Sequence, residues 1–394
     1  MQHFSHLEPA TLEYLFHRPP VAVTAESDLT TRALALGATL YVPATRANLV
    51  ETVRKRAAEG SRSVVLDLED AVADADLEAA RGHVVAALDA LAVDPPEAAV
   101  FVRVRTAEDM HHVCDRLTTG IDVLHGFVLP KFRPESGEKF LEEVAARSAA
   151  AGRHLVVMPV MESREMVYRE TRDDELAGAR DVLDRYRDSV LAVRVGATDM
   201  SGAFGIRRDR DLTIYDVRVV ADTIGAIVNH LGRSDGTGFV VTGPVWEYFA
   251  DHERLFRPML RATPFAEHDA VRFRQQLVSR DIDGLLREVA LDRANGLHGK
   301  TVIHPSHVAA VHSLSVVTHE EYQDAQAIAS SSDGGGVLAS GYGNKMNELG
   351  PHRPWAEQTL RRAAVFGVTA EGVSFVDVMQ ALARRPASTT GTAR

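Results

Sequence analysis

Cysteine is almost absent from this chain, since Cys114 is the only one among 394 residues. One cysteine cannot form an internal disulfide, so nothing in the sequence requires an oxidising compartment. Long apolar runs are also missing, and none approaches the roughly 20 residues that a transmembrane helix needs. The N-terminal segment carries glutamate and histidine where a secretory signal would have an apolar stretch. We therefore expect a cytoplasmic protein with no membrane partner.

Basic residues are in the minority, with 44 Lys and Arg against 55 Asp and Glu and a net charge of −11. Proteins that bind nucleic acids without sequence preference neutralise phosphates with basic groups, so a nucleic-acid partner is not expected. Hydrophobic residues make up 45% and charged residues 25%, as in soluble proteins with a sizeable core. The composition favours a globular protein that acts on a small molecule.

Short apolar segments alternate with amphipathic segments over most of the chain. The apolar segments lie at 39–43, 63–70, 99–105, 126–130, 154–161, 190–197, 238–243 and 300–305. The segments between them have apolar residues at helical spacing. Fully apolar strands that alternate with helices indicate a parallel sheet covered by helices. Eight such units over residues 37–329 predict an α/β fold, a (β/α)8 TIM barrel.

A doubly wound open sheet is the alternative fold. A glycine-rich turn after the first strand would favour it, but the sequence at 43–46 reads Pro-Ala-Thr-Arg. Outside the barrel we expect an N-terminal extension at 1–36, a flexible linker and C-terminal lid at 330–384, and a disordered tail at 385–394. The Ser/Gly-rich stretch at 330–343 is typical of a flexible tether.

Two acidic residues at the ends of consecutive strands form the sharpest candidate site. Glu162 follows the fifth predicted strand and Asp199 follows the sixth, at the carboxyl ends where barrel enzymes carry their catalytic groups. Neighbouring strands lie roughly 4.8 Å apart, so these carboxylates would repel each other unless a cation lies between them. Hard oxygen ligands favour Mg²⁺. The alternative is that both acids only cap the helices that begin after them.

Basic side chains stand at two other strand ends. Arg103 lies within an apolar strand, where a guanidinium needs a carboxylate or phosphate partner. We expect it to bind a substrate carboxylate, the alternative being an internal salt bridge to Glu69 or Asp70. Arg46, just past the first strand, is a second candidate for substrate binding, with an exposed surface position as its alternative.

The remaining strand-end residues allow several roles. Glu69 and Asp70 follow the second strand and are candidates to hold waters around the metal, or they belong to an ordinary polar loop. Lys131 ends the fourth strand and is a candidate substrate ligand, with a Schiff-base lysine or a solvated lysine as alternatives. The 17 histidines show no His-Glu-x-x-His spacing and no cysteine partners, so a zinc site is not expected.

Seven segments, in this order along the chain, resemble the citrate lyase β-subunit-like (CitE-like) group of the HpcH/HpaI aldolase superfamily. They are LYVPATR (40–46), VVLDLEDAV (64–72), VFVRV (100–104), GFVLPK (126–131), MPVMES (158–163), VGATD (195–199) and GKTVIHPSHVAAV (299–311). Each segment alone is a weak signal, but all seven in the family's order are a strong one.

The resemblance implies a (β/α)8 barrel that assembles as a homotrimer or hexamer and has Mg²⁺-dependent carbon–carbon lyase or ester-hydrolase activity. The implied substrates are hydroxyacyl thioesters of coenzyme A or a carrier, or free keto-acid aldols. The family's metal carboxylates fall on Glu162 and Asp199, its substrate-binding arginine on Arg103, and its acidic pair on Glu69 and Asp70.

The sequence departs from the family pattern in four places. Members that act on coenzyme A esters often carry Gly-Lys-Met-x-Asp in the lid, and this aspartate enters a neighbouring subunit's site as the base. Here the segment 344–348 reads Asn-Lys-Met-Asn-Glu, so Glu348 takes its place. The N-terminal extension, the loop 200–213 and the turn Thr-Gly-Pro-Val-Trp after the seventh strand also look unusual. These departures bear on the substrate more than on the metal.

We therefore predict a Mg²⁺-dependent carbon–carbon lyase or aldolase that converts a hydroxy acid or hydroxyacyl thioester into a keto acid or acetyl fragment. Arg103 would neutralise the substrate oxygens. Glu348, or a water held by Glu69 and Asp70, would take the hydroxyl proton. Two alternatives remain at this point, a thioester hydrolase that uses the same site and a non-catalytic metal-binding barrel.

Overall fold

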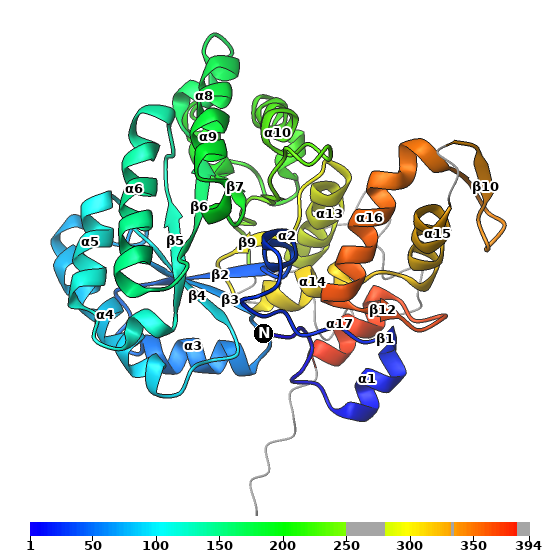
Figure 1. The fold of residues 1–394 in the computed structure, drawn as a ribbon, viewed down its shortest axis with the longest axis horizontal. Coiled ribbons are helices and arrows are strands. Elements are labelled where there is room, and N and C mark those ends of the chain that lie inside the picture. The colour runs from blue at the N-terminus through cyan, green and yellow to red at the C-terminus, as the bar shows by residue number, and fades with distance from the viewer. Residues whose placement is uncertain (250–279, 332–334, 384–394) are drawn as a thin grey trace, which may run out of the picture.

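Eight parallel strands form the centre of the computed structural model, which describes residues 1–249, 280–331 and 335–383 (Figure 1). The strands are β2 (Ala38–Pro43), β3 (Ser63–Asp67), β4 (Ala99–Arg103), β5 (Leu124–Leu129), β6 (Val156–Met161), β7 (Val193–Val195), β8 (Val241–Thr242) and β9 (Lys300–Val302). Their order in the sheet is β8-β7-β6-β5-β4-β3-β2-β9. A parallel bridge between Gly243 and Lys300 brings the two edge strands together. The predicted TIM-barrel fold is confirmed.

Helices follow the strands and cover the outside of the sheet (Figure 1). They are α3 (Leu49–Ala58), α4 (Leu77–Val93), α5 (Ala107–Arg116), α6 (Pro134–Ala151), α7 (Arg164–Val167), α8 (Arg172–Arg185), α9 (Ala197–Gly202), α10 (Arg218–Leu231), α13 (Arg280–Ala294) and α14 (Ser306–Ser315). The segment between the apolar stretches 154–161 and 190–197 contains two helices, α7 and α8, with a break between them. Of the segment between the apolar stretches 238–243 and 300–305, residues 250–279 lie outside the described residues.

The strands are apolar on both faces because each face packs against a different layer. Val65, Phe101 and Met158 point into the barrel and pack together there. Their sequence neighbours, such as Val64 and Val100, pack outward against the helices. Since both layers exclude water, the strands read as continuous apolar runs rather than alternating ones.

The two ends of the chain pack together on one side of the barrel. The N-terminal part contains α1 (Pro9–Leu15), β1 (Phe16–Arg18) and α2 (Leu29–Leu34), and the C-terminal part contains β12 (Val368–Thr369) and α17 (Phe375–Ala383). β1 pairs with β12 in antiparallel fashion. Phe4, Leu15 and Phe16 share one apolar cluster with Val365 and Phe366. The N-terminal residues thus form part of the packed structure, whereas the tail predicted to be disordered at 385–394 lies outside the described residues.

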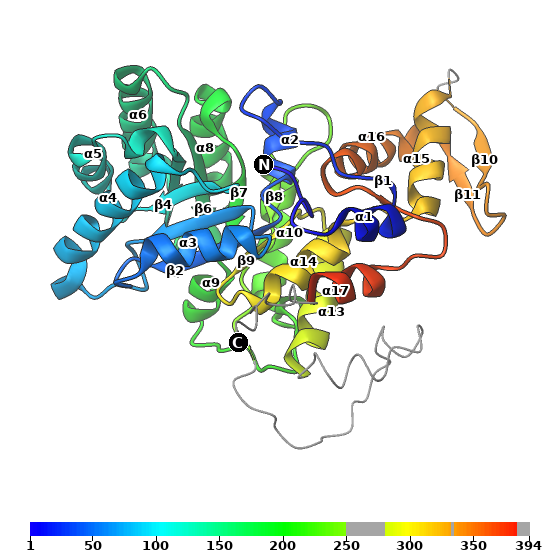
Figure 2. The same cartoon turned by 90° about the horizontal axis from the view of Figure 1, so that it is seen from below.

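The segment predicted to be a lid consists of a hairpin and helices. α15 (His319–Ser330) packs along α16 (Leu349–Phe366), and between them β10 (Val337–Ala339) pairs with β11 (Met346–Glu348). In two perpendicular views the hairpin lies at the edge of the molecule, far from the barrel strands (Figure 1 and Figure 2). The Ser/Gly-rich stretch predicted as a tether therefore includes one strand of this hairpin.

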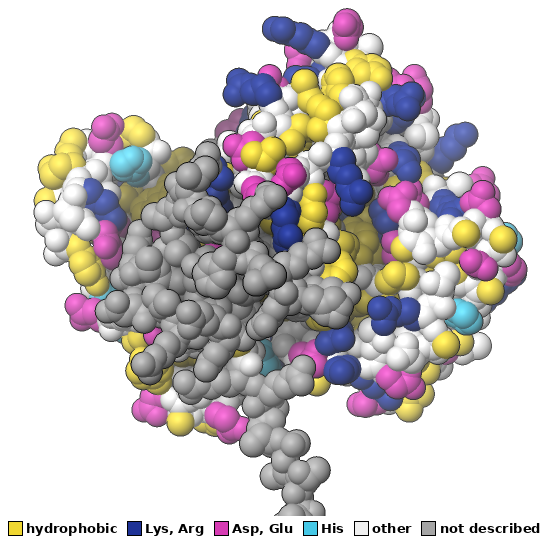
Figure 3. Space-filling model, turned by 180° about the vertical axis from the view of Figure 1, so that it is seen from behind, with side chains coloured by type: hydrophobic (Ala, Val, Ile, Leu, Met, Phe, Trp, Pro, Cys, Tyr) yellow, Lys and Arg dark blue, Asp and Glu magenta, His cyan; other side chains and the backbone are white. Residues whose placement is uncertain are grey.

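Charged side chains of both signs are mixed over the described surface of one face, as Figure 3 shows. No helix among the described residues is long and apolar enough to cross a membrane.

Two buried histidines hold the start of β2 against the N-terminal segment. The backbone N–H of Ala38 donates to Nε2 of His312 over 3.1 Å, and Nε2 of His3 lies 2.9 Å from the Ala35 carbonyl oxygen. The two rings meet edge to face with centroids 4.6 Å apart. Burial lowers the pKa of His3 to about 3 and holds that of His312 well below its usual value. Both rings are therefore neutral in the folded state at neutral pH.

These histidines should make the fold sensitive to acid. Because their folded pKa values lie below the unfolded value of about 6.5, their contribution is present above that pH and is lost as the pH falls. Each can remove up to about 1.4 kcal/mol per pH unit. We expect the free energy of unfolding in urea to fall between pH 7 and pH 5, and to fall less in His312→Gln. The exposed His112→Gln variant is the control, and equal acid sensitivity in all three proteins would contradict this account.

Candidate active site at the carboxyl ends of the strands

Arg103 is the centre of a cluster of acids at the ends of β3 and β4. Its Nε and Nη2 donate to the two carboxylate oxygens of Asp67 over 2.6 and 2.7 Å. Its Nη1 lies 2.9 Å from Glu69 and 3.3 Å from Asp70. The internal salt bridge considered as an alternative is therefore present, with Asp67 as the bidentate partner. Such a fork fixes the guanidinium in one orientation.

Lys131 joins this cluster to the next strand. Its backbone is left-handed, with φ of 47°, and its N–H donates to Oε1 of Glu162 over 2.8 Å. Its Nζ donates to Glu69 over 2.6 Å and lies 3.6 Å from Asp70. Although partial burial opposes its charge, these acids raise the pKa of Lys131. A Schiff-base lysine needs a lowered pKa, so this environment disfavours that alternative.

Glu162 and Asp199 interact closely, as their sequence positions predicted. Glu162 is 6% exposed, and its burial, followed by the repulsion from Asp199, raises its pKa to about 8. Burial likewise raises the pKa of Asp199. Neither acid caps a helix: Ser163 caps α7, and Gly196 precedes α9, which carries Asp199 in its first turn. The capping alternative is therefore wrong.

Gly196 makes room for this pair. A Cβ atom at this position would lie 1.8 Å from Oε2 of Glu162, so no other residue fits without moving the carboxylate. The glycine of the Val-Gly-Ala-Thr-Asp segment is thus required by the close approach of β7 to the Glu162 side chain.

The pair fits a magnesium ion in its chemistry. Among the described residues, no group of three or more histidine, cysteine or acidic side chains forms a metal cluster. Mg²⁺, however, is often held by one or two carboxylates, with waters and substrate completing its coordination. Two adjacent carboxylates whose pKa values are both raised favour a positive charge between them. Glu162 and Asp199 are the residues that would hold it.

Two of the predicted site residues lie apart from this cluster. Arg46 is exposed just past β2, and its side chain forms no hydrogen bond or ion pair with the described residues. Glu348 is exposed at the end of β11, where its backbone N–H donates to Nδ1 of His352 over 3.1 Å. Because the hairpin lies far from the strand ends of its own barrel, Glu348 does not meet Glu162 within one chain (Figure 1 and Figure 2).

The sequence reasoning missed two residues beneath the cluster. The ring of Tyr41 lies between two guanidiniums, 5.2 Å from Arg103 and 5.6 Å from Arg194. Arg194 is 1% exposed inside the barrel and donates to the hydroxyls of Thr39 and Thr301. An arginine within the apolar segment 190–197 was a visible signal of the same kind as Arg103. Tyr41 gave no such signal, because aromatic residues are common in strands.

Comparison with known proteins places this barrel among characterised folds. No curated protein matches the chain significantly. A citrate lyase from Burkholderia xenovorans is similar over 89% of this chain and 96% of its own, with 16% identity and a TM-score of 0.59. CitE from Mycobacterium tuberculosis, solved with magnesium, acetoacetate and coenzyme A, is similar over 83% and 97%, with 22% identity and a TM-score of 0.51.

A malate synthase from Haloferax volcanii is similar over 73% of this chain and 70% of its own, with 13% identity and a TM-score of 0.50. At such identities these structures support the fold alone. The family match is broader, since residues 30–368 match the C–C bond lyases of the TIM-barrel fold. The segment matched contains β2 to β9 and every residue of the acidic cluster, and the chain therefore belongs to the family of C–C bond lyases with the TIM-barrel fold.

Proposed function

We propose that this protein is a Mg²⁺-dependent carbon–carbon lyase or aldolase that cleaves a hydroxy acid or hydroxyacyl thioester into a keto acid or acetyl fragment. The observation that carries the proposal is the adjacent pair Glu162 and Asp199 beside the Arg103 cluster. Two carboxylates that could bind a divalent cation lie beside a fixed guanidinium. Both are at the carboxyl end of the barrel, where TIM-barrel enzymes have their catalytic groups.

Different side chains would bind the metal, bind the substrate and transfer the proton. Glu162 and Asp199 would hold Mg²⁺, which when bound acts as a Lewis acid toward carbonyl and carboxylate oxygens. Arg103 is held by Asp67 and would neutralise negative charge that develops on the substrate oxygen. Lys131, kept protonated by Glu69 and Asp70, adds a second positive charge at the same mouth. Arg46 would bind the substrate from its exposed position past β2.

Cleavage also requires a base for the substrate hydroxyl. Glu69 accepts from Lys131 and contacts Arg103, so it could act only through a water that it holds. Glu348 lies too far from its own barrel mouth, so in this proposal it acts in the site of a neighbouring subunit. A homotrimer or homohexamer would supply that arrangement. Lids of this kind exclude water as they complete a site.

Two other functions are compatible with the same residues. A thioester hydrolase would release a free thiol without forming a keto-acid product, so a combined thiol and keto-acid assay distinguishes it from the lyase. A non-catalytic barrel would bind the metal and turn over nothing. Acetoacetate and coenzyme A, named in the CitE structure, suggest first compounds for such assays.

The metal assignment predicts a specific loss of Mg²⁺ binding. Glu162→Gln and Asp199→Asn each remove one of two charged ligands with little change in shape, so we expect calorimetry to show at least about a tenfold loss in affinity. The matched control is Glu165→Gln, an acid on the short helix α7 just after Glu162 that instead pairs with Arg133 over 3.0 Å. Unchanged Mg²⁺ affinity in both site variants would contradict the assignment.

The role of Arg103 predicts that lysine cannot replace it. Lysine keeps the charge but loses the two parallel hydrogen bonds to Asp67, because an ammonium is a point charge rather than a planar fork. We expect Arg103→Lys to lower kcat/KM by about a hundredfold while Mg²⁺ binding persists. Near-normal kcat/KM would instead give Arg103 a purely structural role.

The role of Glu348 predicts complementation between two inactive variants. Glu162→Gln loses its own metal site and Glu348→Gln loses the base that it supplies to a neighbour, so each alone should be inactive. Subunits dissociated, mixed in equal amounts and reassembled should regain about a quarter of the normal activity, since a quarter of the sites then combine an intact barrel with an intact lid. Mixtures that stay inactive, or a fully active Glu348→Gln, would contradict this role.

A further inference from the structure

A cavity of about 270 Å³ lies beside α9, the helix that carries Asp199. Its walls come from α9, from the loop after α9 and from the segment after β8, with Ala197, Thr198, Ser201, Ile206, Arg207, Arg208, Ile214, Val245 and Glu247 as lining residues. The helix α9 thus contributes to both the candidate metal site and the cavity, because Asp199 pairs with Glu162 while Thr198 and Ser201 line the cavity. Along α9, Thr198 and Ser201 lie within one helical turn of Asp199.

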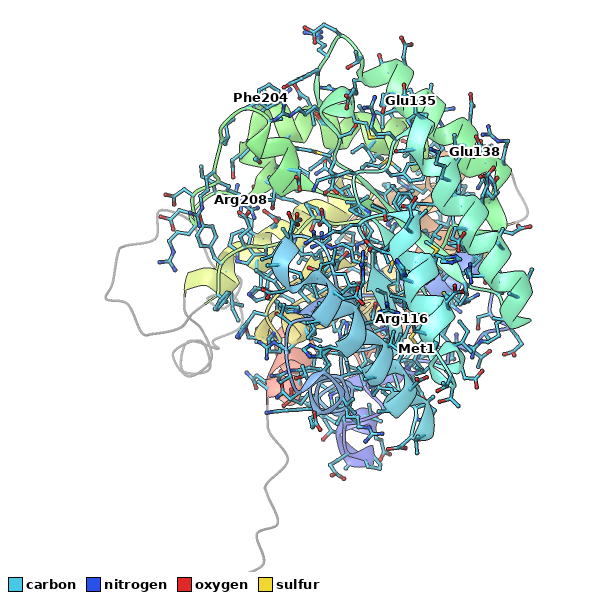
Figure 4. All side chains as sticks on the ribbon, turned by 90° about the vertical axis from the view of Figure 1, so that its left-hand side faces the viewer. Met1, Arg116, Glu135, Glu138, Phe204 and Arg208 are labelled. Carbon is cyan, nitrogen blue, oxygen red and sulfur yellow. The ribbon has the colours of Figure 1, made fainter. Side chains whose placement is uncertain are left out.

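The cavity is built from two of the segments in which the sequence departs from its family's pattern. Residues 200–213 supply Ile206, Arg207 and Arg208, and the Thr-Gly-Pro-Val-Trp turn supplies Val245. Figure 4 labels Phe204 and Arg208 on the loop that follows α9. Two unusual segments that meet in one cavity beside a catalytic centre indicate a feature of the substrate, because the loops after barrel strands determine specificity.

Arg208 is held rigidly in the wall of this cavity. Its side chain is 2% exposed and forms an ion pair with the fully buried Glu288. Its Nη2 donates to the carbonyl of Val245 over 3.2 Å, and its guanidinium lies 4.7 Å over the ring of Trp246. Its Nε is buried and has no hydrogen-bond partner among the described residues. A buried N–H without a partner is costly, so a ligand oxygen or a water is expected there.

The remaining charges of the lining favour an anion. Glu247 is the only acid among the lining residues that the structure describes, and it accepts from the Thr198 hydroxyl over 3.0 Å and lies 3.7 Å from Arg208. Arg207 is exposed at the rim, with no ion pair within the described part of the chain. Among the described lining residues, Arg207 is thus the charged side chain without an ion-pair partner. A guanidinium fits carboxylate or phosphate oxygens best.

We propose that this cavity binds a second anionic group of the substrate, a carboxylate or a phosphate that is remote from the bond that is cleaved. The proposal rests on the proposed function, because the reacting end would lie at Glu162 and Asp199. A cavity of about 270 Å³ suits a short acidic arm. The substrate class is therefore a small acid with an anionic group at each end.

Calorimetry with two simple anions tests the cavity. Inorganic phosphate and malonate are titrated into the full-length protein in the absence of Mg²⁺, so that the metal site does not contribute. We expect at least one anion to bind, and Arg207→Gln to weaken its binding by about tenfold. Arg218→Gln, which removes an exposed arginine on α10 outside the cavity, is the matched control and should bind like the wild type.

Each result of this experiment bears on the proposal. Binding of phosphate alone identifies a phosphorylated substrate, and binding of malonate alone identifies a dicarboxylate. Failure of both anions to bind, or equal affinity in Arg207→Gln and wild type, would overturn the subsite. Mg²⁺ titrations of the same samples keep the proposals apart. Mg²⁺ binding without anion binding removes only the subsite, whereas anion binding at Arg207 without Mg²⁺ binding removes the proposed function.

Discussion

Two carboxyl groups that lie side by side at the end of the barrel impose the constraint on which the rest of this site depends. Glu162 and Asp199 cannot both be ionised at low cost, because burial raises both pKa values and the charge of Asp199 raises that of Glu162 further. The surrounding structure nevertheless holds them together. Gly196 leaves space for the Glu162 carboxylate, and Lys131 adopts a left-handed backbone to donate its N–H to it. A site that keeps two acids in contact is suited to binding a cation.

The sequence allowed the barrel to be predicted because each strand is an uninterrupted apolar run and each following segment has helical spacing. All eight strands lie within or overlap the predicted ranges. The pairing of β1 with β12 could not be predicted, since it joins residues about 350 positions apart and short strands give no local signal of their partner. The hairpin β10–β11 could not be predicted for another reason: its glycines and serines are as typical of a flexible tether as of a turn.

The charged residues of the site could be predicted from the sequence, but the contacts between them could not. Glu162, Asp199 and Arg103 stand out because charge is expensive at the end of an apolar strand. The choice of Asp67 as the bidentate partner of Arg103 depends on the parallel register of β3 and β4, in which these two residues are directly opposite. Tyr41 and the cavity beside α9 arise only when distant segments meet, so they required the structure. The metal-site residues follow the family pattern, whereas the cavity is formed by residues that depart from it.

The central claim is that the Glu162–Asp199 pair holds a divalent cation on which the substrate's oxygens converge. A crystal structure of the protein soaked with Mg²⁺ and pyruvate tests this most directly. The account predicts one metal ion bound by both carboxylates, with pyruvate oxygens completing its coordination and Arg103 close to the same oxygens. A metal-free pair at saturating Mg²⁺, or an ion bound at other residues, would contradict it.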